Sequence, residues 1–225
     1  MFTQKSEAVY AADNAVRSCF AEYNRKLYER FHILLIDSSY KAYDSGKDRV
    51  AGHFSTYIEN SMTGSGLCYV EIGECHDAAE SDGEYIYASG VGYAKAKLGA
   101  DERLSGNDDD TFFLTYLINV LGDREIGYLL HGAESDDENI DPAVTSFEEN
   151  EEEISYEDHL CRRLAKEDIS VVRRRFCELL TEYMRENGSP GFDLETCYHD
   201  ISFEIGVEGR GFGEYCITRR YSYDI

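Results

Sequence analysis

The sequence predicts an α+β fold in which an antiparallel sheet built from two hairpins is packed by long amphipathic helices. Apolar residues recur at helical spacing over residues 6–35 and again over 155–187. Apolar and polar residues alternate strictly over 197–207, as in a strand with one buried face. At 225 residues, 42% of them hydrophobic, the chain is long enough to bury a sizeable core.

Two helices are expected near the N-terminus. Ser6 is a suitable N-cap for a long helix over 6–35, whose apolar face would be formed by Val16, Phe20, Tyr23, Leu27, Phe31 and Leu34. A shorter helix is expected over 47–60, with the apolar residues Val50, Phe54, Tyr57 and Ile58.

The middle of the chain predicts a hairpin and then a buried helix. Segments 67–73 and 84–91 are rich in aromatic and β-branched residues and are bounded by Gly-containing loops, which is typical of strands. Asp108, Asp109 and Asp110 precede an apolar run over 111–122. This acidic triplet could bind a divalent cation, but capping of the following helix is the favoured interpretation.

The second long helix is expected over 155–187, with a possible break near Asp168 and a stop at 187–190, where the sequence reads Asn-Gly-Ser-Pro. Its apolar face would contain Cys161, Ala165, Val172, Phe176, Leu179 and Tyr183. Arg173, Arg174 and Arg175 could grip phosphate, but in so acidic a chain we expect them to meet carboxylates.

The C-terminal segment predicts the clearest strand pair. A three-residue loop over 209–211 would place Asp200 opposite Arg220 and Phe203 opposite Ile217. Ile201, Phe203 and Ile205 would then face the core, and Glu204 would face solvent.

Charge is the strongest functional signal. The chain has 45 acidic and 22 basic residues, a net charge of −23, and residues 134–158 contain twelve acids and no Lys or Arg. We interpret 134–154 as an acidic linker or loop between residues 1–133 and 155–225, the two flanking regions sharing one sheet in one domain. The candidate partner-binding residues are Glu134, Asp136, Asp137, Glu138, Glu148, Glu149, Glu151, Glu152 and Glu153.

The mean charge density is too low for DNA mimicry by the whole surface. A charge of −23 over ~10,000 Å² is one charge per ~450 Å². B-DNA carries one charge per ~110 Å². A mimic would therefore need its acids concentrated in one stripe, and the alternative is an acidic surface that only solubilises the chain.

The cysteines and the apolar runs indicate the cellular compartment of the protein. Seven cysteines, an odd number, favour reduced thiols, and no apolar run approaches the ~20 residues that span a membrane. The N-terminus lacks the basic and apolar pattern of a signal peptide. We expect a cytoplasmic protein with no membrane partner.

No motif predicts a catalytic, cofactor or metal site. Gly90-Val91-Gly92 lies between a predicted strand and a short basic helix, but Lys95 stands where a dinucleotide fingerprint needs its third glycine. The run Cys75-His76-Asp77 would point its side chains apart. Cys197 and His199 share a strand face, which is the apolar one.

Two classes of function remain. The favoured hypothesis is an acidic protein that binds and inhibits a basic, nucleic-acid-handling protein, as inhibitors, immunity proteins and DNA mimics do, without contacting nucleic acid directly. The alternative is a small α+β enzyme or a nucleotide- or ligand-binding domain whose site assembles from distant residues, with His53, His76, His199 and 90–97 as places to look.

Overall fold

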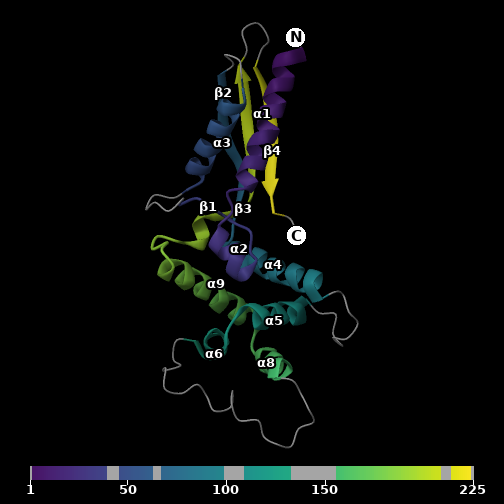
Figure 1. Cartoon of the computed structure of the whole chain (residues 1–225), viewed down its shortest axis with the longest axis vertical. Coiled ribbons are helices and arrows are strands. Elements are labelled where there is room, and N and C mark those ends of the chain that lie inside the picture. The colour runs from purple at the N-terminus through teal and green to yellow at the C-terminus, as the bar shows by residue number, and fades with distance from the viewer. Residues whose placement is uncertain are drawn as a thin grey trace, which may run out of the picture. The chain divides into compact units, whose positions relative to one another are not determined.

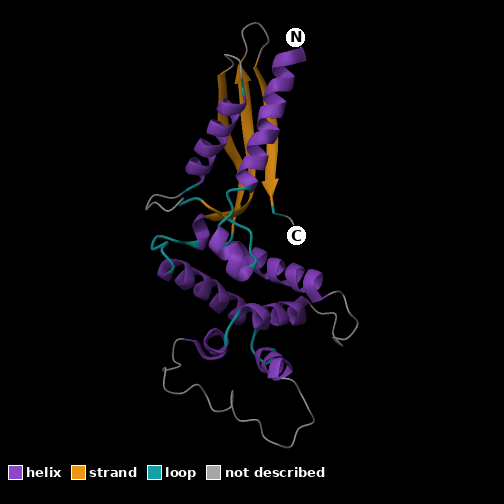
Figure 2. Ribbon diagram, in the orientation of Figure 1, coloured by secondary structure: helices purple, strands orange, loops and turns teal. Residues whose placement is uncertain are grey.

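The computed structural model describes residues 2–39, 46–62, 67–98, 109–132, 156–208 and 214–223. Helices and a four-stranded antiparallel sheet make up an α+β fold (Figures 1 and 2). The elements are α1 (Phe2–Phe20), α2 (Arg25–Phe31), β1 (Ile36–Asp37), α3 (Lys47–Ser61), β2 (Leu67–Asp77), α4 (Glu80–Leu98), α5 (Asp109–Val120), α6 (Asp123–His131), α8 (Tyr156–Leu164), α9 (Ile169–Glu186), the 3-10 turn η2 (Leu194–Thr196), β3 (Cys197–Glu208) and β4 (Glu214–Ser222).

The chain divides into two compact units that alternate along the sequence. Unit 1 comprises residues 1–29, 34–80 and 184–224. Unit 2 comprises residues 30–33 and 81–183 with residue 225. All four strands belong to unit 1, whereas the described elements of unit 2 are helical (Figure 2).

Strand β3 is the centre of the sheet. It pairs with β2 along one side, and with β4 and the short β1 along the other, always antiparallel. The predicted C-terminal hairpin is therefore present as β3–β4. The predicted first hairpin is not, because β2 pairs with β3 and residues 84–91 form no strand.

Helices α1 and α3 lie side by side across one face of this sheet (Figure 1). Phe203 of β3 is fully buried, and its ring stacks on Phe54 of α3 with 3.9 Å between centroids. The α3 helix and its apolar residues Val50, Phe54 and Ile58 are as predicted. Helix α1 instead buries a stripe of small residues, namely Ala8, Ala11, Ala12, Ala15 and Cys19.

The predicted helix over 6–35 is wrong in its length and in the face of its first half. It is two helices, because α1 ends at Phe20 and Tyr23 forms an isolated bridge with Ile36. The Asn24 side chain then accepts hydrogen bonds from the backbone N–H groups of Lys26 and Leu27, and so caps α2. Phe20, predicted on the buried face, is 38% exposed.

The predicted register of the C-terminal hairpin is off by two residues. Asp200 faces Ser222 and Phe203 faces Arg219, while Ile205 faces Ile217. A shift of two preserves the faces, so Ile201, Phe203 and Ile205 are buried and Glu204 is exposed, as predicted. The loop over 209–211 lies outside the described residues.

Residues 84–91, predicted as a strand, lie inside helix α4 of unit 2. Gly90 lets this helix pack closely on α5: a Cβ added there would lie 2.6 Å from Cδ1 of Tyr116 and 2.9 Å from Cδ2 of Phe113. Aromatic packing thus overrides the β propensity of the segment. Gly90-Val91-Gly92 is consequently helix interior and not a phosphate-binding loop.

The other helices of unit 2 follow the sequence more closely. Helix α5 buries Phe113, Tyr116 and Leu117, and the Tyr116 hydroxyl donates a hydrogen bond to the Phe31 carbonyl. Its first-turn acids bind side chains: Asp109 pairs with Lys95, and Asp110 accepts a hydrogen bond from Tyr87. Helix α6 was not predicted.

The predicted break near Asp168 separates α8 from α9. The Asp168 carboxylate accepts a hydrogen bond from the backbone N–H of Ser170. Hydrogen bonding to the backbone and the side chain of Ser170 lowers the pKa of Asp168. Helix α9 ends at Glu186, and Gly188 follows with a φ of 92°, which suits glycine at a helix terminus.

Candidate protein-binding surface

The face of the sheet opposite α1 and α3, called here the open face, carries a mixed set of mostly polar side chains that includes three acids. The β3–β4 register places the even-numbered residues of both strands on it, and the β2–β3 register adds residues of β2. Its members are Tyr69, Glu71 and His76 of β2, Asp200, Ser202, Glu204 and Gly206 of β3, and Cys216, Thr218, Arg220 and Ser222 of β4.

An irregularity in β2 decides which of its residues reach the open face. Ile72 pairs with Phe203 but Cys75 pairs with Ile201, so β2 holds one more residue than β3 in this interval, as in a β-bulge. A Cβ at Gly73 would lie 2.6 Å from the Ser202 hydroxyl oxygen, and that hydroxyl accepts a hydrogen bond from the Glu74 N–H. The extra residue turns His76 onto the same face as Glu71.

Two glutamates face each other on this surface. Glu71 of β2 is the direct cross-strand partner of Glu204 of β3, and both are exposed. Among the described residues, neither glutamate has an ion pair with a basic side chain. Like charges placed directly opposite one another destabilise a sheet, so this pair is a cost to the fold.

Tyr69 lies two cross-strand pairs further along, which is the next position on the same face, and it faces Gly206. A Cβ at position 206 would collide with Cζ of Tyr69, so the tyrosine ring lies directly against the glycine backbone. Tyr69 is nevertheless 49% exposed, which makes it one of the few large exposed aromatic residues in the described chain. Aromatic side chains of this kind are enriched at protein interfaces.

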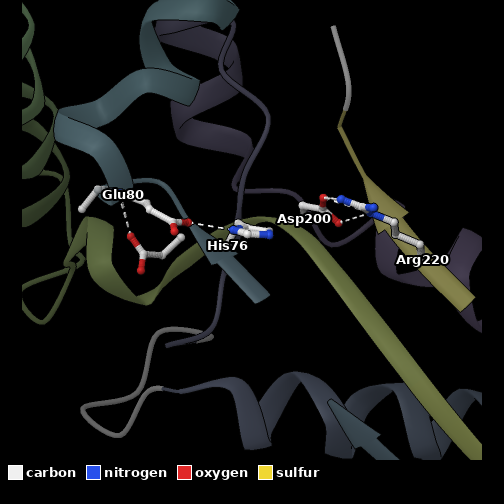
Figure 3. A network of polar contacts seen from close by, with 6 residues as sticks. His76, Glu80, Asp200 and Arg220 are labelled. Carbon is white, nitrogen blue, oxygen red and sulfur yellow. Dashed lines mark hydrogen bonds and ion pairs between the residues drawn. The ribbon is translucent and has the colours of Figure 1, made fainter. Parts of the chain in front are cut away.

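At the other end of the open face lie two ion pairs, drawn in Figure 3. His76 Nδ1 lies 2.8 Å from Glu80 Oε2, and Arg220 Nε lies 2.8 Å from Asp200 Oδ1. His76 and Asp200 are themselves cross-strand partners. Hydrogen bonding to Glu80 raises the pKa of His76 above its usual value of 6.5.

The cysteine beside His76 is not an activated nucleophile. Burial raises the pKa of Cys75 to about 12, so the thiol is protonated at neutral pH. Cys75 and His76 point to opposite faces of the sheet, as the sequence predicted, and Asp77 accepts hydrogen bonds from the N–H groups of Ala79 and Glu80 at the start of α4. The three residues form no catalytic triad.

The other candidate residues serve local structure. His53 lies 3.0 Å from a carboxylate oxygen of Glu22, which also accepts a hydrogen bond from Tyr57. Cys197 is fully buried and His199 is half-buried with its ring near His76. In the ranges given above, no three or more His, Cys, Asp or Glu side chains gather closely enough to hold a metal ion.

Two arginines of the basic run at 173–175 bind groups of unit 2, the unit to which they belong. Arg173 pairs with Glu84, and Arg175 donates hydrogen bonds to the carbonyls of Leu129 and Leu130 near the end of α6. The nine predicted partner-binding residues, from Glu134 to Glu153, lie outside the described residues. The sequence pattern alone could place Glu204 on an exposed face, but it did not reveal Tyr69 or Glu71 as its neighbours.

Comparison with protein-family models, with curated protein sequences and with solved structures finds no match. None of the described helices is long and apolar enough to cross a membrane.

Proposed function

We propose that this chain is an acidic interaction protein that binds a basic, nucleic-acid-handling protein and inhibits it. The observation that carries the proposal is the placement of Glu71 directly opposite Glu204 on the exposed face of the sheet, without a described cation between them. A fold that retains such a pair accepts a loss of stability that a bound cationic surface would reverse.

The net charge supports the same interpretation. A charge of −23 repels nucleic acid and attracts basic surfaces over a distance, which raises the association rate. Inhibition would follow because a surface that binds phosphates is basic, and the acidic chain would occupy it in place of nucleic acid.

The acidic segment 134–154 is the second contact region of this proposal. Its carboxylates supply the dense negative charge that the mean surface lacks. We assign it the role of steering the partner, while the open face supplies a fixed contact surface. Replacing Glu148, Glu149, Glu151, Glu152 and Glu153 with Gln should therefore slow association and leave thermal stability nearly unchanged.

The proposal is tested by capture followed by competition. The immobilised full chain is exposed to a lysate of its source cells at low and high salt, and the proteins released by salt are identified by mass spectrometry. Each is then purified and tested for binding to nucleic acid with and without the chain. We expect basic proteins whose nucleic-acid binding falls as the chain is added.

The double variant Glu71→Gln/Glu204→Gln should weaken this competition, and the matched variant Glu59→Gln/Glu195→Gln, which removes two exposed carboxylates elsewhere in unit 1, should not. Capture that is indifferent to salt, or partners that still bind nucleic acid at saturation with the chain, would refute the proposal.

A further inference from the structure

We infer that Tyr69, Glu71 and Glu204 form a receptor for an arginine side chain of the basic partner. This inference rests on the proposed function and specifies the chemistry of its contact. It assigns this sheet face an occupant, chosen by charge complementarity and by the exposed ring of Tyr69, which lies two residues from Glu71 on the same face.

The first part of the receptor is the ring of Tyr69. It is held against the backbone of Gly206, where even a methyl group would collide with it, and about half of the residue faces solvent. Because the glycine leaves room for the ring to lie low on the sheet, its free side is available to a flat cation. A cation over an aromatic ring at an exposed site contributes roughly 0.5–1 kcal/mol, a factor of about two to five in affinity.

The second part is the pair of carboxylates. Glu71 lies two residues from Tyr69 on the same face, about 7 Å along the strand. Glu204 lies opposite Glu71, and its exposed side chain leans toward Gly73, with Oε1 3.6 Å from the point where a Cβ at that glycine would be, so it must turn toward Tyr69 to share a guanidinium with the ring. The two glycines, Gly73 and Gly206, thus leave the space that Glu204 and Tyr69 occupy.

Arginine fits this arrangement better than lysine. The guanidinium is planar, stacks on aromatic rings and donates paired hydrogen bonds to carboxylates, whereas the ammonium group of lysine is a compact, strongly hydrated charge. A surface that acted through charge alone would bind both residues alike. Preference for arginine is therefore the property that separates this receptor from a merely acidic face.

The test compares nonapeptides of arginine and of lysine, titrated into the full chain by calorimetry at about physiological salt, ~0.15 M. The chain carries the five Glu→Gln substitutions at 148, 149 and 151–153, so that the acidic segment contributes less to binding. We expect the arginine peptide to bind several-fold more tightly. Tyr69→Ala should reduce this preference about two- to five-fold, and Tyr69→Phe should retain it.

Tyr28→Ala is the matched control, because Tyr28 is 40% exposed on α2 and no carboxylate stands three or four residues from it in the sequence. Equal binding of the two peptides, or a preference that survives Tyr69→Ala, would overturn the receptor and leave the proposed function standing. If neither peptide binds and no basic protein is captured, both fail.

Discussion

Arg220 reaches diagonally across the β3–β4 ladder to Asp200. Its direct partner on β3 is Ser202, yet its guanidinium nitrogen Nε lies 2.8 Å from Asp200 Oδ1 and 3.0 Å from Oδ2. Asp200 is 5% exposed, so the arginine compensates a carboxylate that is largely removed from water. The sequence predicted this pair as direct neighbours, and the contact survives the two-residue change of register because diagonal partners remain within reach of a long side chain.

Arg220→Ala should lower the free energy of unfolding by about 1–3 kcal/mol, because it leaves the buried Asp200 carboxylate without its charged donor. Urea denaturation measures the loss. Arg25→Ala, which removes an exposed ion pair with Glu29, should leave the midpoint nearly unchanged. If adding Asp200→Asn to Arg220→Ala produces a purely additive loss, the two side chains do not interact.

Phe203→Ala should cost on the order of 3–5 kcal/mol, because it removes a fully buried ring that stacks on Phe54. Glu204→Gln, on the next residue and the opposite face, should raise stability by a few tenths of a kcal/mol, since it relieves repulsion from Glu71. The gain should shrink as salt increases. Equal shifts of the urea midpoint for the two variants would contradict the assigned faces.

Gly90→Ala should destabilise unit 2 by about 1–3 kcal/mol, because the new methyl group would overlap the rings of Tyr116 and Phe113. Gly127→Ala is the matched control in helix α6, where a Cβ meets nothing within 4 Å. That variant should gain roughly 0.5–1 kcal/mol from helix propensity. Thermal unfolding of the two variants should therefore shift in opposite directions.

His76 should titrate above its usual pKa of 6.5, because its protonated form is hydrogen-bonded to Glu80 and lies near Asp200 and Glu74. A raised pKa means that the folded state binds the proton more tightly than the unfolded state. The stabilisation is thus complete below pH 6.5 and is lost as pH rises through the raised pKa. NMR titration of the imidazole should show the shift, and Glu80→Gln should reduce it; an unchanged pKa in that variant would exclude Glu80 as the cause.

Local patterns predicted much of the fold. Strict alternation assigned the faces of β3 correctly, helical spacing found α3 and α9, and the acidic triplet before an apolar run found α5. The segment 84–91 was misassigned because its aromatic and β-branched residues favour strand, while its helix depends on how closely Gly90 approaches α5. That contact joins distant residues and leaves no local signal.

The open face was only partly predictable for the same reason. Glu204 could be placed on it from alternation alone. The pairing of Glu204 with Glu71 depends on a register between segments far apart in the chain, and the presence of His76 on this face depends on the irregularity at Gly73. Neither follows from the spacing of residues within one segment.

The pairing of β2 with β3 also sets the order in which the chain can fold. During synthesis β2 emerges well before β3, and residues 78–196, which include most of unit 2, must be made before the two strands can meet. Closing so long a loop is entropically costly, and contacts of this range slow folding. Unit 2 can therefore fold before β3, the strand with which β2 pairs, has been synthesised. In that interval we expect β2, which carries Ile72, to be an unpaired strand prone to aggregation, and we expect Glu71 and Glu74 to oppose that aggregation through their charge.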